Sequence, residues 1–353
     1  MRKLIVTILF LTFNIYLYSQ MGGKYTYQFL EISGSSRIAA LGGNNISHYD
    51  NDINFVFQNP ALLRSEMNEK LMMNYISYVS DINLGQTIYV REIENIGTFA
   101  AGLEYFNYGK FLNANEFGNI LGDFSASEYA IMISHSRNII DPKFNVGASF
   151  KIIASDYWQY SSFGIALDAG VSYIDTTKLF SAGMLIKNLG TQIKPYTKGN
   201  YEPLPIDLQI GITKKFAHAP FRVSITAQHL LNWNLSYKTV FTKENLSFSD
   251  TPEKENFFDK VSNIGDEIFR HFILAVEIVP NDVFFISAGY NYQRRAEMKL
   301  PFNSKLTGFS IGAGFKFSKF SISYGLASYH LAGASNCFSL GLNLGAFYKK
   351  VND

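Results

Sequence analysis

The segment FGIALDAGVSY, residues 163–173, decides the fold because apolar and small side chains alternate along it. One set of alternate positions is apolar: Phe163, Ile165, Leu167, Ala169, Val171 and Tyr173. The other set is small or polar: Gly164, Ala166, Asp168, Gly170 and Ser172. Successive side chains of a β-strand point to opposite faces, so this period of two predicts a strand with one apolar face.

The same alternation returns at residues 284–292, 309–317 and 338–348. Each apolar face is about ten residues long and has aromatic side chains near its ends, which is typical of a transmembrane β-barrel. A soluble β-sandwich also alternates, but its strands are usually about 5–6 residues long and carry more outward charge. We therefore predict an all-β fold, a 14-stranded antiparallel transmembrane β-barrel.

The lengths of the connections agree with this count. The predicted strands are 69–80, 83–92, 96–107, 127–137, 143–155, 160–174, 179–189, 205–215, 221–231, 268–279, 283–292, 307–317, 320–328 and 337–348. Connections after even-numbered strands are short, and most after odd-numbered strands are long: 108–126, 190–204, 232–267, 293–306 and 329–336. Short periplasmic turns and long external loops alternate in this way in bacterial barrels. We expect the long loops to face the cell surface.

Composition excludes several classes of protein. Of the 353 residues, 47% are hydrophobic, which is too many for a disordered chain. Charged residues make up 17%, against roughly 25% in soluble domains. The net charge of +2 gives no basic surface for nucleic acid, so no nucleic-acid partner is expected. The single cysteine, Cys337, excludes an internal disulfide.

The first residues resemble a secretory signal peptide, which we place at 1–19. Arg2 and Lys3 precede an apolar stretch at 4–13, and Ser19 offers a cleavage point before Gln20. The alternative is a membrane anchor, but Asn14 interrupts the stretch well short of the roughly 20 residues that a spanning helix needs.

Residues 20–66 lack strand alternation and are predicted to form an N-terminal hatch, or plug, before the barrel at 67–353. Residues 35–43 indicate a short helix that begins after a Ser cap and ends at Gly42 and Gly43. In the sequence Asn59-Pro60-Ala61, Asn occupies a cap position and Pro the first helical position, which indicates a second short helix. A fourteen-strand barrel is wide enough to hold such a segment.

The sequence resembles the PorQ family of outer-membrane proteins of the type IX secretion system in Bacteroidota. The resemblance rests on GGKYTYQFL (22–30), SRIAALGG (36–43), NPALL (59–63), RHFILAVE (270–277), AGYNYQRR (288–295) and SYHLAG (328–333). It covers nearly all of the chain after the signal peptide. It implies a fold similar to the FadL and PorV barrels.

The resemblance also implies a function. It implies a non-catalytic anchor in the attachment complex, which holds a PorZ-type surface protein near the sortase-like PorU and its partner PorV. Outer-membrane lipid, including anionic lipopolysaccharide, is a further expected contact, and no cofactor is implied. The alternative is a FadL-like transporter of hydrophobic small molecules.

Two external segments are candidate docking sites for the partner. In loop 232–267, Phe257, Val261, Ile264 and Ile268 are spaced as one apolar helix stripe, with Phe258 beside it. This helix is either a lid on the barrel mouth or a docking surface. Arg294 and Arg295 form a basic pair in loop 293–306, which either binds a partner or is merely solvated.

No motif indicates catalysis. The six histidines are scattered, and the chain lacks the H-E-x-x-H, G-x-S-x-G and P-loop patterns. We therefore expect neither catalytic residues nor a metal site, and we predict that the protein is not an enzyme.

Overall fold

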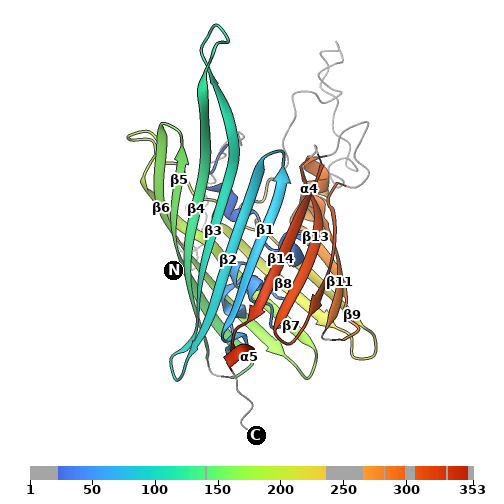
Figure 1. Ribbon diagram of the computed structural model, residues 1–353. Coiled ribbons are helices and arrows are strands. Elements are labelled where there is room, and N and C mark those ends of the chain that lie inside the picture. Colours follow the sequence, from blue (N-terminus) through green and yellow to red (C-terminus); the bar gives the residue numbers. More distant parts are fainter. Residues whose placement is uncertain are drawn as a thin grey trace, which may run out of the picture.

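The structure is a computed structural model that describes residues 23–139, 141–235, 265–281, 283–298, 307–330 and 333–348 (Figure 1). Within these ranges fourteen strands form a closed barrel, in which each strand pairs antiparallel with its sequence neighbours and β1 pairs with β14. The strands are β1 (Lys70–Val79), β2 (Ile82–Ile93), β3 (Gly97–Ala114), β4 (Ile120–Asn138), β5 (Phe144–Tyr157), β6 (Tyr160–Asp175), β7 (Phe180–Lys194), β8 (Asp207–Lys215), β9 (Phe221–Ala227), β10 (Phe272–Ile278), β11 (Phe284–Asn291), β12 (Phe309–Lys316), β13 (Phe320–His330) and β14 (Gly333–Asn343).

The predicted fold class and strand order are confirmed. β3 and β4 extend farthest beyond their predicted ends, β7 continues to Lys194, and β14 runs over Gly333–Asn343 rather than 337–348. Residues 108–126, expected as a loop, continue β3 and β4 into a hairpin that projects past its neighbours (Figure 1). Gly109 and Gly122 have positive φ in this hairpin, and the register shifts beside each of them. These irregularities interrupt the period-two pattern, so the sequence does not show the strands there.

The two faces of the strands are those that the alternation predicts. In β6, Phe163, Leu167 and Val171 are exposed on the outside, whereas Asp168 and Ser172 are buried inside. Outward apolar and inward polar side chains are the arrangement of a barrel in lipid. Among the described residues, no helix is long and apolar enough to cross a membrane.

Residues 23–68, which we call the N-terminal segment, lie inside this barrel (Figure 1). The segment contains five short helices: η1 (Gln28–Glu31), α2 (Ser36–Ala40), η2 (Ile53–Phe57), η3 (Pro60–Leu62) and η4 (Ser65–Met67). Two more short helices, α4 (Tyr292–Glu297) and α5 (Gly345–Tyr348), follow β11 and β14. The helix starts predicted near Ser35 and Asn59 are confirmed, but only Asn59 makes a capping hydrogen bond with its side chain.

Small inward residues on the strands make room for the N-terminal segment. A side chain at Gly147 of β5 would overlap the backbone of Pro60 and Ala61, and one at Gly289 of β11 would overlap the backbone at Gly42. Glycine permits such close approach because it has no Cβ atom. The inward positions of the strands are therefore small partly because the N-terminal segment packs directly against them.

Candidate functional site

The N-terminal segment is hydrogen-bonded to strands on every side of the barrel. Tyr27 bonds to Ser162 of β6, Ser36 to Ser339 of β14, and Asn54 to Asn74 of β1. Further bonds join Ser47 to Thr213 of β8, Ala40 to Ser310 of β12, Ala61 to Asn145 of β5 and Leu63 to Ser136 of β4. The segment therefore holds the strands together from within.

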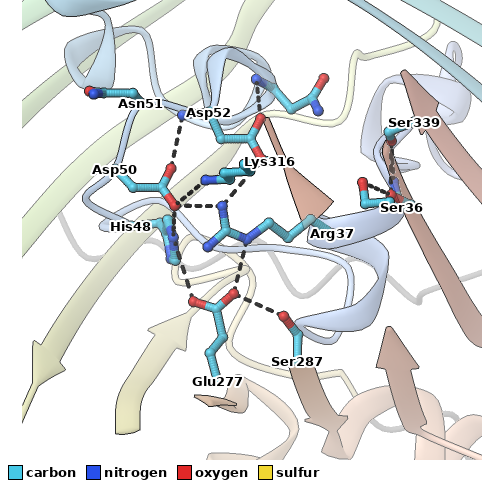
Figure 2. A network of polar contacts seen from close by, with 12 residues as sticks. Ser36, Arg37, His48, Asp50, Asn51, Asp52, Glu277, Ser287, Lys316 and Ser339 are labelled. Carbon is cyan, nitrogen blue, oxygen red and sulfur yellow. Dashed lines mark hydrogen bonds and ion pairs between the residues drawn. The ribbon is translucent and has the colours of Figure 1, made fainter. Parts of the chain in front are cut away.

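A buried charge cluster is the strongest of these links (Figure 2). Arg37 of α2 donates from Nε to Glu277 Oε1 of β10 over 2.9 Å, and from Nη1 to Asp50 Oδ2 over 2.5 Å. Asp52 Oδ2 lies 3.3 Å from the same Nη1 atom. Arg37 and Glu277 are almost fully buried, and a charge in such a place is stable only when it is paired.

Residues of three more strands complete the charge cluster. Glu277 also accepts hydrogen bonds from Arg222 of β9, at 3.0 Å, and Ser287 of β11, at 2.8 Å. Lys316 of β12 places Nζ 3.1 Å from Asp50 Oδ2. The cluster thus matches three cations with three carboxylates: Arg37, Arg222 and Lys316 with Asp50, Asp52 and Glu277. This balance indicates a clamp that holds the segment in the barrel.

His48 lies at the centre of the cluster and is stacked on Phe55 with 4.2 Å between ring centroids. Burial lowers the pKa of His48, and the nearby Arg222 and Arg37 lower it further, against the carboxylates. Burial by itself would raise the pKa of Asp50, but the cations Arg37 and Lys316 outweigh it and hold that pKa well below its usual range. His48 is therefore neutral and Asp50 charged at neutral pH.

The predicted hatch residues have structural roles. Asn59 Oδ1 accepts a hydrogen bond from Ala61 N at 3.0 Å, which caps η3, and Pro60 occupies the first turn. Gly42 and Gly43 both have positive φ, 93° and 94°, where the chain turns after α2. The Gly42 carbonyl accepts hydrogen bonds from Asn291 Nδ2 and Arg294 Nη1.

The predicted docking residues are placed in different surroundings. Arg294 is directed to the Gly42 carbonyl, 3.1 Å away, and its guanidinium lies 4.2 Å over the Tyr329 ring. Arg295 donates to Thr307 Oγ1 at 3.1 Å. Docking by this pair stays a prediction. Phe257, Phe258 and Val261 lie outside the described residues, as does most of the predicted helix.

The projecting hairpin is a site that the sequence does not indicate. β2 pairs with β3 only as far as Asn107, and β5 pairs with β4 only as far as Ala126. Residues 110–125, which we call the ribbon, therefore pair only with each other. The ribbon exposes large apolar side chains: Leu112, Phe117, Ile120 and Leu121.

Among the described residues, no group of three or more His, Cys, Asp or Glu side chains is placed to hold a metal ion. The buried titratable groups of the charge cluster are paired with one another.

The chain is similar in fold to known outer-membrane barrels. A deletion mutant (ΔS2) of the monoaromatic hydrocarbon channel TodX matches with a TM-score of 0.51 at 13% identity, over 88% of this chain and 97% of that one. The Pseudomonas putida toluene transporter TodX gives 0.49 at 12% identity, over 88% and 96%. A Pseudomonas aeruginosa FadL homologue gives 0.46 at 12% identity, over 87% and 97%. The chain matches no protein-family model and no curated protein.

Proposed function

We propose that this chain is a non-catalytic outer-membrane anchor that holds a surface protein through the ribbon at 110–125. The observation that carries the proposal is the ribbon itself, two strands that leave the barrel with both edges unpaired. A two-stranded hairpin is only marginally stable in water by itself. Its free edges are a template on which a strand of another protein can pair.

The exposed side chains of the ribbon agree with a protein partner. Phe117 is 80% exposed and Leu112 is 67% exposed. Residues 97–107 of β3 already supply the roughly 9–11 residues that cross a bilayer, so the ribbon stands beyond the lipid. Contiguous apolar side chains in water are typical of a protein interface.

The resemblance to the PorQ family suggests the identity of the partner. On this proposal, the long-loop end faces the cell surface and the ribbon binds a PorZ-type protein beside PorU and PorV. The N-terminal segment acts as a hatch, and the outer apolar band fixes the barrel in the membrane. Contact of the long-loop end with anionic lipopolysaccharide belongs to the same proposal.

The second candidate is a transporter of hydrophobic small molecules, and the similarity to the hydrocarbon channel favours it. The interior gives it less support. The inward side chains around the N-terminal segment are largely polar: Asn74, Gln86, Glu104, Glu128, Ser149, Asp168, Ser172, Asp207, Gln209, Thr213, Glu277 and Ser287. A hydrophobic solute gains little from contact with these residues. The anchor is proposed on the ribbon, whereas the similarity of fold supports transport.

The test is to purify the native complex through a tag on this chain after gentle solubilisation of outer membranes. A ribbon variant would carry Leu112→Lys, Phe117→Lys and Ile120→Lys. The matched control is Tyr201→Lys, because Tyr201 is 62% exposed between β7 and β8, away from the ribbon. We expect a stoichiometric surface protein with the native chain and the control, and its loss from the ribbon variant.

Two results would contradict the anchor. One is an equal yield of the partner from the ribbon variant and the control. The other is a native chain that purifies without protein partners but with bound lipid or hydrocarbon, which would place transport first.

A further inference from the structure

A cavity of about 480 Å³ lies inside the barrel at the long-loop end, above the N-terminal segment. Its volume is in the range of small-molecule sites, roughly 300–1,000 Å³. The residues that line it come from the N-terminal segment, from the loop-side ends of several strands and from α4. Neither the charge cluster nor the ribbon forms part of it.

One side of the cavity is a connected row of primary amides. Asn44 Nδ2 donates to Gln209 Oε1 of β8 at 2.9 Å and to Gln228 Oε1, just after β9, at 3.3 Å. Gln228 Nε2 then donates to Gln293 Oε1 of α4 at 3.0 Å. A primary amide offers two donors and an oxygen with two lone pairs, so each member of the row retains hydrogen-bonding capacity.

Two buried oxygen atoms beside this row have no hydrogen-bond partner in the structure. They are Oδ1 of Asn44, whose residue is 8% exposed, and Oδ1 of Asp207, whose residue is 2% exposed. Both residues line the cavity. Both oxygen atoms are themselves shielded from the cavity, so they show only that the polar groups packed behind its wall keep spare acceptor capacity.

Aromatic rings line the cavity on the side of β1, β3 and β13. Tyr78 stacks on Tyr329 with 5.5 Å between ring centroids, and Phe106 packs against Tyr108 at 4.7 Å. β1 lies seven strands from β8 in the closed order of fourteen, so the aromatic and amide sides face each other.

The charges on the lining argue against an anionic ligand. Two cations, Lys187 and Arg294, face three carboxylates, Glu31, Asp207 and Glu297. Arg294 is already bonded to the Gly42 carbonyl. The lining thus holds more carboxylates than Lys and Arg side chains, so it has no excess of these cations that would attract a carboxylate or phosphate.

We propose that this cavity binds a neutral saccharide. A sugar ring carries hydroxyl groups that both donate and accept, which suits the spare donors and acceptors of the amide row. The C–H face of the ring is apolar and suits the aromatic side. This inference stands independently of the proposed anchor function, because it uses none of the residues of the ribbon.

The test uses the full-length barrel purified in a detergent without a sugar head group, such as an alkyl-dimethylamine oxide. Maltotriose and a neutral oligosaccharide released from the outer-membrane glycolipid are the probes, with oleate as the anionic comparison. Saturation-transfer NMR and calorimetry report binding at millimolar concentration. We expect at least one saccharide to bind and oleate not to compete with it.

Gln209→Leu is the test variant, and Gln192→Leu is its matched control. Gln192 is an equally buried inward amide of β7 that does not line the cavity. We expect saccharide binding to weaken roughly tenfold in Gln209→Leu, as for one lost buried hydrogen bond, and to persist in the control. Heat-modifiable migration in gels checks that both variants fold. If Gln209→Leu does not fold, Gln228→Leu takes its place in the binding test.

The proposal fails if the native barrel binds neither saccharide, if Gln209→Leu and Gln192→Leu bind equally, or if oleate displaces the sugar. Binding of the released oligosaccharide by itself supports a free sugar as ligand. Additional binding of the intact glycolipid supports a lipid-linked one.

Discussion

Arg37 and Glu277 meet inside the barrel, 2.9 Å apart, although 240 residues separate them in the chain. One belongs to the first α-helix of the N-terminal segment and the other to β10. The pair joins the two parts of the molecule that the sequence shows as separate, the hatch and the barrel. We therefore expect the stability of the barrel to depend on a segment that contributes no strand to it.

Removal of one partner of this pair is expected to destabilise the folded barrel. Arg37→Ala leaves Glu277 and Asp50 buried without their main cation, which should lower the free energy of unfolding by about 3–5 kcal/mol. The measurement is urea unfolding in micelles. Arg91→Ala is the control, because Arg91 pairs with Glu69 at an exposed site and should cause little change. Equal effects of the two substitutions would contradict the clamp.

The cluster also predicts destabilisation by acid. The folded pKa of His48 is lowered, so below about pH 6.5 the unfolded chain binds a proton that the folded chain does not. The folded pKa of Asp50 is also lowered, so its contribution is present above about pH 3.9 and is lost as the pH falls through the folded value. As the pH is lowered from 8 to 3, the free energy of unfolding should decrease below about pH 6.5 because of His48, and again below about pH 3.9 because of Asp50. His48→Gln should remove the first of these decreases only.

Close packing of the N-terminal segment on the strands is tested at Gly147. Gly147→Val would force the backbone of Pro60 and Ala61 away from β5 and should cost about 1–3 kcal/mol. Limited proteolysis should then cleave within residues 23–68. Gly85→Ala is the control, because nothing lies within 4 Å of a side-chain carbon added there. If residues 23–68 stay resistant to proteolysis in Gly147→Val, the contact at Gly147 is not needed to hold the segment in place.

The proposed hatch role predicts a change in conductance. The intact chain should give no steady current in a planar lipid bilayer, because the N-terminal segment occupies the interior. A variant without residues 23–63 should conduct ions, since polar inward faces favour a water-filled lumen. Steady current through the intact chain, equal to that of the deletion variant, would exclude the hatch.

The barrel can be predicted from the sequence because its signal is local. Alternation at residues 163–173 needs no knowledge of other strands, and the faces that it assigns are confirmed. The cap at Asn59 is also a local signal and is present. The ribbon was wrongly expected as a loop, because residues 108–126 have irregular spacing and a turn-forming composition.

The long-range contacts could not be predicted in this way. Arg37 and Glu277 are single charges in unrelated segments, and no spacing rule connects them. Arg294 looked like part of an external basic pair, yet its guanidinium is directed to the Gly42 carbonyl. The sequence does show charged residues on an inward face that is otherwise made of small side chains. It does not show which residues they pair with.

The enclosure of the N-terminal segment has a consequence for biogenesis. The segment precedes β1 in the chain, and β14, which pairs with β1 to close the barrel, comes last. Because the segment is bonded to strands from both ends of the chain, its contacts are completed only when the last strands are in place. Ser36 bonds to both Ser323 of β13 and Ser339 of β14. A segment that is synthesised before every strand thus contacts the two strands that are synthesised last.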